Sequence, residues 1–245
     1  MKLMKGKAKQ MEKQRLRSLE AVVFDMDGLM FDSERYIQVS WDKAGTILGY
    51  GTLGDHIRET LGFNGEKRRE FFLKLCGQDF PYDRFLNLYR EIYYDMSREK
   101  GIPTKKGLHE ILDVLRGLGI KMGVATSSSR ENTMKNLERE KIRDYFQVII
   151  TGDMIKHGKP EPDIYQKACE ELGVLPEQAI ALEDAINGIK AAHAAGMMPV
   201  MIPDLIQDTT PVDKILFGKY DSLSEFAEVI RKTVGKKEKK SEEEA

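Results

Sequence analysis

Two pairs of acidic residues directly follow apolar segments of this chain. Asp25 and Asp27 come after the run AVVF, and Glu183 and Asp184 come after the run AIAL. Carboxylates can bind a hard metal ion, form a covalent acyl-phosphate or transfer protons. Gly28 allows the chain to turn directly behind the first pair. A buried strand that ends in carboxylates indicates that something binds them, because a desolvated charge without a partner is costly.

Hydroxyl groups and a lysine follow two other apolar segments. Thr126 and Ser127 come directly after the run MGVA, and Lys159 lies in the segment HGKPEPDIY, beyond the run VII. The carboxyl ends of parallel strands meet at one edge of a sheet, so we expect the acids, the hydroxyls and the lysine to converge there. Clustered carboxylates need a counter-charge, and Mg²⁺ favours oxygen ligands and substrate phosphate oxygens. The sequence therefore predicts an Mg²⁺ site that receives a phosphate group.

Each of these residues suits one role in phosphoryl transfer. Asp25 is the predicted nucleophile. Asp27 is the predicted general acid for the leaving oxygen and then the general base for water. Thr126, the backbone amide of Ser127 and Lys159 are predicted to hold the phosphoryl oxygens and to stabilise the charge that develops during transfer.

The segments between the apolar runs predict the elements that position these residues. Helical patterns occur at 108–118, in SSRENTMKNLEREK, which we expect to open with a capping box from Ser128 to Glu131, and in DAINGIKAAHAAG, which Gly196 should close. Continuous apolar runs predict strands that are buried on both faces. Alternating strands and helices predict the α/β class, with a doubly wound, Rossmann-like parallel sheet. The predicted strands are 21–24, 122–125, 148–150, 179–182 and 199–202.

One long interval interrupts this alternation. Nearly a hundred residues separate the first two predicted strands, and they include several helical patterns and more than half of the aromatic residues. Such a segment can form a core of its own, so we predict an inserted α-helical cap domain. Its loop LGFNGE at 61–66, with Ser33 and Glu34 at the hinge, is predicted to face the core site and to set substrate choice. The predicted domains are a flexible basic tail at 1–18, a core at 19–33 and 104–235, the cap at 34–103 and a flexible tail at 236–245.

The composition argues against several classes of partner. The chain has 245 residues, with 39 basic and 40 acidic residues and a net charge of -1, so no global field favours nucleic acid or a membrane surface. No segment approaches the roughly 18 apolar residues that span a bilayer, and the N-terminus lacks the apolar run of a signal peptide. Cys76 and Cys169 lie far apart, as is typical of reduced thiols in the cytoplasm. We expect a cytoplasmic monomer whose partner is a small-molecule phosphate ester.

Four segments of the chain, in order, resemble the four motifs of the haloacid dehalogenase superfamily. They are FDMDG, VATSSSREN, GKPEPDIY and ALEDAINGIKAA. The resemblance is closest to the beta-phosphoglucomutase-like phosphatase branch, in which a helical cap follows the first motif, and it spans about residues 20–230. It implies Mg²⁺-dependent hydrolysis of a small phosphorylated metabolite through an aspartyl-phosphate.

The resemblance also implies a role for each matching residue. Asp25 would be the nucleophile and a ligand of Mg²⁺, and Asp27 would be the acid and base, with its backbone carbonyl also on the metal. Asp184 would ligate Mg²⁺, and Glu183 would do so directly or through water. The residues that would bind phosphate are Thr126 and Lys159.

Other functions stay open at this point. The namesake of this branch is a mutase, an isomerase whose activity, as the resemblance implies, needs a histidine in the first cap helix and an arginine in a cap loop. This chain has Ile37 and approximately Gly65 at those places. The third possibility is a non-catalytic protein that only senses phosphate. The intact set of catalytic residues argues against it: Asp25, Asp27, Lys159 and Asp184. Dehalogenase relatives lack the second aspartate of the first motif. We therefore predict a phosphatase, with the isomerase as the alternative.

Overall fold

The computed structural model describes residues 14–60, 65–206 and 208–234. The chain divides into two compact units. One contains residues 1–30 and 104–245, and the other contains residues 31–103. We call them the core unit and the inserted unit. The sequence places the start of the insertion at residue 34, three residues later than this division.

The core unit is built on a six-stranded sheet in which every pair of neighbours is parallel. The strand order is β3-β2-β1-β4-β5-β6, so β1 lies at the centre. The predicted class and the five predicted strands are confirmed. The sequence missed β6, because its two residues, glycine and lysine, form no apolar run. The strands are β1 (Ala21–Phe24), β2 (Lys121–Ala125), β3 (Val148–Ile150), β4 (Ala179–Glu183), β5 (Met198–Met201) and β6 (Gly218–Lys219).

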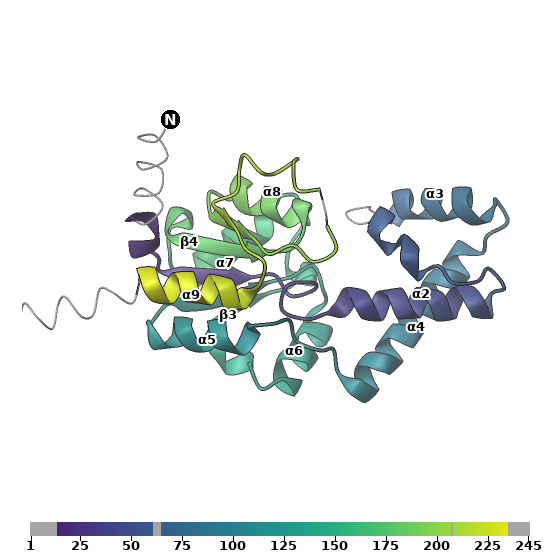
Figure 1. The fold of residues 1–245 in the computed structure, drawn as a ribbon, viewed down its shortest axis with the longest axis horizontal. Coiled ribbons are helices and arrows are strands. Elements are labelled where there is room, and N and C mark those ends of the chain that lie inside the picture. The colour runs from purple at the N-terminus through teal and green to yellow at the C-terminus, as the bar shows by residue number, and fades with distance from the viewer. Residues whose placement is uncertain (1–13, 61–64, 207, 235–245) are drawn as a thin grey trace, which may run out of the picture. The chain divides into compact units, whose positions relative to one another are not determined.

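Helices cover both faces of the sheet (Figure 1). On one face α7 and α8 pack on alternate strand residues such as Val23, Ala125 and Ala181, and on the other face α5 packs against α9. This two-sided burial explains why the strand sequences are apolar throughout. Besides a helical turn at residues 14–17, the described helices of the core unit are α5 (Leu108–Gly117), α6 (Arg130–Arg139), α7 (Asp163–Leu172), α8 (Ile186–Ala194) and α9 (Leu223–Thr233), with short 3-10 turns η2 (Arg143–Tyr145), η3 (Gly152–Met154) and η4 (Pro176–Gln178).

Two predicted helix ends have different outcomes. Gly196 follows the end of α8 with a positive φ of 85°, as a C-terminal glycine should. The predicted capping box at Ser128 is wrong. The residue that caps α6 is Ser129, whose side chain accepts a hydrogen bond from the backbone N–H of Asn132. Ser128 is therefore available for another contact, described below.

The inserted unit is helical and has its own aromatic core. Trp41 is buried at its centre, with its ring 5.0 Å from Phe72, 6.0 Å from Phe85 and 5.9 Å from Tyr89. Edge-to-face pairs of this kind add stability beyond the area that they bury. The elements are α2 (Ser33–Ile47), the 3-10 turn η1 (Gly54–Thr60), α3 (Gly65–Cys76) and α4 (Tyr82–Lys100).

Backbone hydrogen bonds hold together the two points where the chain leaves and re-enters the core unit. Within the core unit, the N–H of Lys105 donates to the carbonyl of Met30 at 2.9 Å. Within the inserted unit, the N–H of Asp32 donates to the carbonyl of Pro103 at 2.8 Å. Each unit therefore closes its own chain ends.

The predicted tails and thiols are partly described. Residues 1–13 and 235–245 lie outside the described residues, but residues 14–17 are helical and Leu16 is only 2% exposed, so this part of the predicted N-terminal tail packs on the protein instead. Both cysteines are free thiols, as expected. Among the described residues, no helix has the length and apolar character that crossing a bilayer requires.

Candidate functional site

The predicted site residues come from the central strands of the sheet. The backbone N–H of Asp25, just beyond β1, donates to the carbonyl of Leu182 in β4, so Asp25 lies beside Glu183 at the end of that strand. On the other side of β1, Thr126 follows β2 and is buried. The chain fills the sheet on one side of β1 before it crosses to the other side with β4. Ligands of doubly wound sheets bind at this point, beyond the carboxyl ends of the strands.

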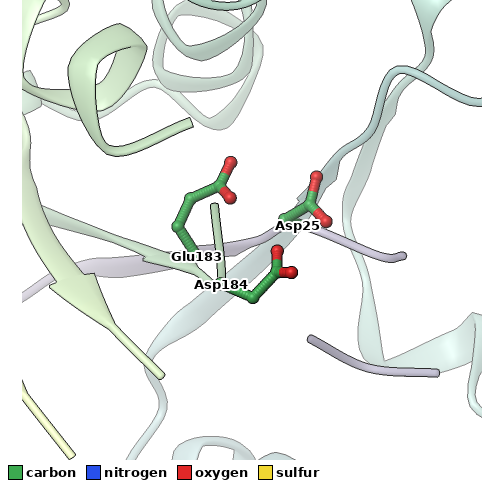
Figure 2. Close-up of side chains that lie close together, drawn as sticks. All are labelled: Asp25, Glu183 and Asp184. Atoms are coloured by element: carbon green, nitrogen blue, oxygen red, sulfur yellow. The ribbon is translucent and has the colours of Figure 1, made fainter. Parts of the chain in front are cut away.

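Three carboxylates meet at this edge. Asp25, Glu183 and Asp184 are 7%, 1% and 5% exposed, and one carboxylate oxygen of each lies within 4.8 Å of the others. Figure 2 shows the three side chains converging on a common space. Buried carboxylates so close together repel one another, and each has lost most of its hydration. The arrangement therefore favours a cation.

Lys159 supplies one positive charge to this cluster. Its Nζ donates to Asp25 Oδ1 at 2.5 Å, to Glu183 Oε1 at 2.7 Å and to the carbonyl of Ala125 at 3.0 Å. Burial lowers the pKa of Lys159, but the charges of Asp25 and Glu183 outweigh burial and raise it above its usual value. The lysine is therefore a permanent cation at this site.

The charges of the cluster do not balance without a further cation. Burial is the main cause that raises the pKa of Asp25 to about 8. The charge of Lys159 opposes this rise, and the charge of Glu183 adds to it. Three ionised carboxylates and one lysine leave an excess of two negative charges. A divalent cation with oxygen ligands would offset this excess and favour the ionised form of Asp25. The residues present therefore fit Mg²⁺.

Asp27 lies at the rim of the cluster and is half-buried. Ser128 Oγ donates to Asp27 Oδ2 at 2.6 Å, and the backbone N–H of Ser128 donates to Thr126 Oγ1 at 3.1 Å. Ser127 is exposed, and its carbonyl packs closely against Gly152. The segment after β2 thus reaches Asp27 through Ser128, a contact that the sequence did not predict.

Tyr165 is a second residue that the sequence did not single out. It lies in α7, is fully buried, and its hydroxyl donates to Glu183 Oε1 at 2.6 Å. The only signal in the sequence that could have indicated Tyr165 is its place within GKPEPDIY. There the helical pattern predicts only that its side chain packs in the core. A buried tyrosine needs a hydrogen-bond partner for its hydroxyl, and here the partner is a site carboxylate.

Gly28 has two reasons to be glycine. Its φ is 83°, in the left-handed region, and a Cβ built on it would lie 2.3 Å from Asp184 Oδ2. Glycine at this turn therefore leaves room for the Asp184 carboxylate, and any residue with a Cβ would occupy that room.

We expect Gly28→Ala to weaken Mg²⁺ binding by about tenfold or more, because the new methyl group displaces Asp184. The measurement is titration calorimetry of the substrate-free protein with Mg²⁺. Gly119→Ala is the matched control, because Gly119 has a φ of 66° but nothing within 4 Å of its Cβ position. Gly119→Ala should lower the thermal unfolding temperature but leave Mg²⁺ affinity unchanged. Equal Mg²⁺ affinities of Gly28→Ala and the native protein would contradict the proposed role of this turn.

Comparisons with known proteins place the chain among related sequences. The family model of haloacid dehalogenase-like hydrolases matches residues 22–202. A phosphorylated carbohydrates phosphatase of Thermotoga maritima is 30% identical over 73% of this chain and 82% of the relative. A beta-phosphoglucomutase of Bacillus subtilis is 30% identical over 74% of this chain and 82% of the relative. The crystal structure of CbbY from Rhodobacter sphaeroides in complex with phosphate has a TM-score of 0.69 and 28% identity, covering 85% of this chain and 96% of that chain.

Proposed function

The chain belongs to the haloacid dehalogenase-like hydrolases, and we propose that it is an Mg²⁺-dependent phosphatase that hydrolyses a small phosphorylated metabolite through an aspartyl-phosphate. A sugar phosphate is the favoured class of substrate, since a relative at 30% identity is a phosphorylated carbohydrates phosphatase. The observation that carries the proposal is the cluster in which Lys159 pairs with Asp25 among three buried carboxylates.

The first half of the reaction transfers the phosphoryl group to the protein. A carboxylate oxygen of Asp25 attacks phosphorus, and the bond from phosphorus to the ester oxygen breaks. Asp27 gives its proton to that leaving oxygen, so the alcohol departs neutral. Lys159, Thr126 and the backbone N–H of Ser127 hold the remaining phosphoryl oxygens.

The second half regenerates the protein. Asp27, now a carboxylate, removes a proton from a water molecule, and the water oxygen attacks phosphorus. The bond between phosphorus and the Asp25 oxygen breaks, which releases inorganic phosphate and restores both residues to their starting states. Ser128 fixes the orientation of Asp27 through its hydrogen bond to Oδ2.

The metal would be held by the carboxylates of Asp25 and Asp184 and by the backbone carbonyl of Asp27, with Glu183 beside them. When bound, Mg²⁺ supplies charge neutralisation at the nucleophile and the transferring phosphoryl group. We further propose that the protein acts as a cytoplasmic monomer on a free metabolite, without nucleic acid or membrane partners. The free cysteines fit a reducing compartment.

The alternative is a beta-phosphoglucomutase-type isomerase, which the Bacillus subtilis relative favours. Its cap chemistry would need a proton-bearing side chain and a phosphate-binding cation in the inserted unit. The resemblance puts Ile37 in α2, and approximately Gly65 at the start of α3, at those positions. Neither can transfer a proton or bind a phosphate by charge. Residues 61–64 of the loop expected to set substrate choice lie outside the described residues.

A single assay separates these functions. The protein is supplied with Mg²⁺ and a panel of sugar phosphates, nucleotides and phosphorylated acids, and beta-glucose 1-phosphate is tested with a bisphosphate primer. We expect release of inorganic phosphate from one class of ester and no glucose 6-phosphate. Rapid formation of glucose 6-phosphate with little free phosphate would replace the phosphatase with the isomerase. Absence of turnover across the whole panel would instead favour a phosphate sensor.

A further inference from the structure

We propose that Tyr165 is a positioning residue that holds the Glu183 carboxylate on Lys159, so that Glu183 anchors the lysine instead of ligating the metal directly. The inference rests on the proposed function, because it assigns roles within the same phosphate site. It concerns how the side chain of Lys159, the proposed phosphate-binding cation, is held in position.

A single oxygen of Glu183 carries the contacts. Glu183 Oε1 accepts hydrogen bonds from Lys159 Nζ at 2.7 Å and from the Tyr165 hydroxyl at 2.6 Å. The lysine Nζ also lies 5.1 Å from the centre of the Tyr165 ring, within the range of a cation–π contact. Tyr165 therefore contacts both members of the ion pair and fixes their relative position.

The Glu183 carboxylate also packs against α8. A Cβ built on Gly188 would lie 1.9 Å from both Glu183 Cδ and Oε1, and 2.2 Å from Oε2. The carboxylate thus packs directly on the helix backbone and is 1% exposed. Between Gly188 and the Tyr165 hydroxyl it has little freedom to turn toward a metal ion.

The three N–H donors of Lys159 are all in use. They go to Asp25, Glu183 and the carbonyl of Ala125. A phosphoryl oxygen can accept a hydrogen bond from Lys159 only if one of these three hydrogen bonds is broken. The Ala125 carbonyl is fixed by β2 and Glu183 is fixed by Tyr165, so the exchangeable partner is Asp25, the residue that the phosphoryl group approaches.

The test compares Tyr165→Phe with Tyr145→Phe. Tyr145 is the matched control, because its hydroxyl also donates to a carboxylate at 2.6 Å, that of Asp113, but on the exposed surface of the core unit. Titration calorimetry measures two affinities of each protein, for Mg²⁺ alone and for inorganic phosphate at saturating Mg²⁺. We expect Tyr165→Phe to weaken phosphate binding by about tenfold, as the loss of a hydrogen bond to a charged group predicts. The Mg²⁺ affinity of Tyr165→Phe should stay within about threefold of the native value. Tyr145→Phe should change neither affinity.

Further variants keep the inference falsifiable. Glu183→Gln should weaken phosphate binding. It should lower Mg²⁺ affinity less than Asp184→Asn does, because it removes a nearby charge but no ligand. Adding Tyr165→Phe to Glu183→Gln should cause little further loss of phosphate affinity, because the two residues act together. Gly188→Ala, whose methyl group would press on the Glu183 carboxylate from α8, should lower phosphate affinity in the same way. Loss of Mg²⁺ affinity in Glu183→Gln as large as in Asp184→Asn would overturn the inference, as would unchanged phosphate affinity in Tyr165→Phe.

These measurements are independent of turnover. A native protein that binds Mg²⁺ and phosphate but hydrolyses no ester would contradict the proposed phosphatase, and the calorimetric test of Tyr165 would still be decided. A native protein that hydrolyses esters while Tyr165→Phe binds phosphate normally would leave the function intact and remove the role of Tyr165.

Discussion

Replacement of Asp25 by Asn should reduce turnover of the best phosphate ester by roughly four orders of magnitude or more, as expected for loss of a nucleophile. An amide at this position cannot form the acyl-phosphate. The fold should survive, because Asn has the same shape and removes a carboxylate whose burial is costly. We therefore expect the thermal unfolding temperature of Asp25→Asn in chelator to equal or exceed that of the native protein. Rates and unfolding temperatures are measured on the same preparations.

The companion variant Asp27→Asn makes this test specific. It retains the nucleophile but cannot donate or remove a proton, so both half-reactions should be slow. Mass spectrometry after mixing with substrate should find a phosphorylated protein for Asp27→Asn and none for Asp25→Asn. A normal rate for Asp25→Asn would remove the nucleophile assignment.

Removal of divalent cations should have the second large effect. In excess chelator we expect turnover to fall by about 100-fold or more, because the clustered carboxylates lose both their counter-ion and the charge that polarises the phosphoryl group. Asp184→Asn should raise the Mg²⁺ concentration for half-maximal activity by at least about tenfold. Initial rates measured across a Mg²⁺ titration report both quantities.

The control for this second prediction is Asp113→Asn, which removes an exposed carboxylate of α5 that pairs with Arg116. Its dependence on Mg²⁺ should match that of the native protein. Full activity in excess chelator would show that the reaction proceeds without a metal, and the charge argument for the cluster would then fail.

The strand ends could be predicted from the sequence because two simple regularities coincide there. Continuous apolar runs mark buried strands, and the polar residues directly behind them must lie at one edge of a parallel sheet. This logic places Asp25, Thr126 and Glu183 without any knowledge of side-chain contacts. It does not depend on the helices, whose ends are less certain from the sequence.

The contacts between side chains could not be predicted in the same way. Three consecutive serines follow Thr126, and the structure gives each a different environment: Ser127 is exposed, Ser128 binds Asp27, and Ser129 caps α6. Composition alone cannot distinguish them, because all three have the same capping chemistry. Tyr165 was missed for a related reason, since its ring satisfies the helical pattern and its hydroxyl finds Glu183 only in three dimensions.

The hydrogen bond between Lys105 and Met30 also bears on how this protein could evolve. Because the core unit closes its own chain across the insertion point, the ends of any replacement segment would already be held together. The entropy cost of closing a loop grows only with the logarithm of its length, so segments of very different size are tolerated at such a junction. Natural selection could therefore exchange or remodel the inserted unit while the carboxylate cluster on the sheet stays unchanged.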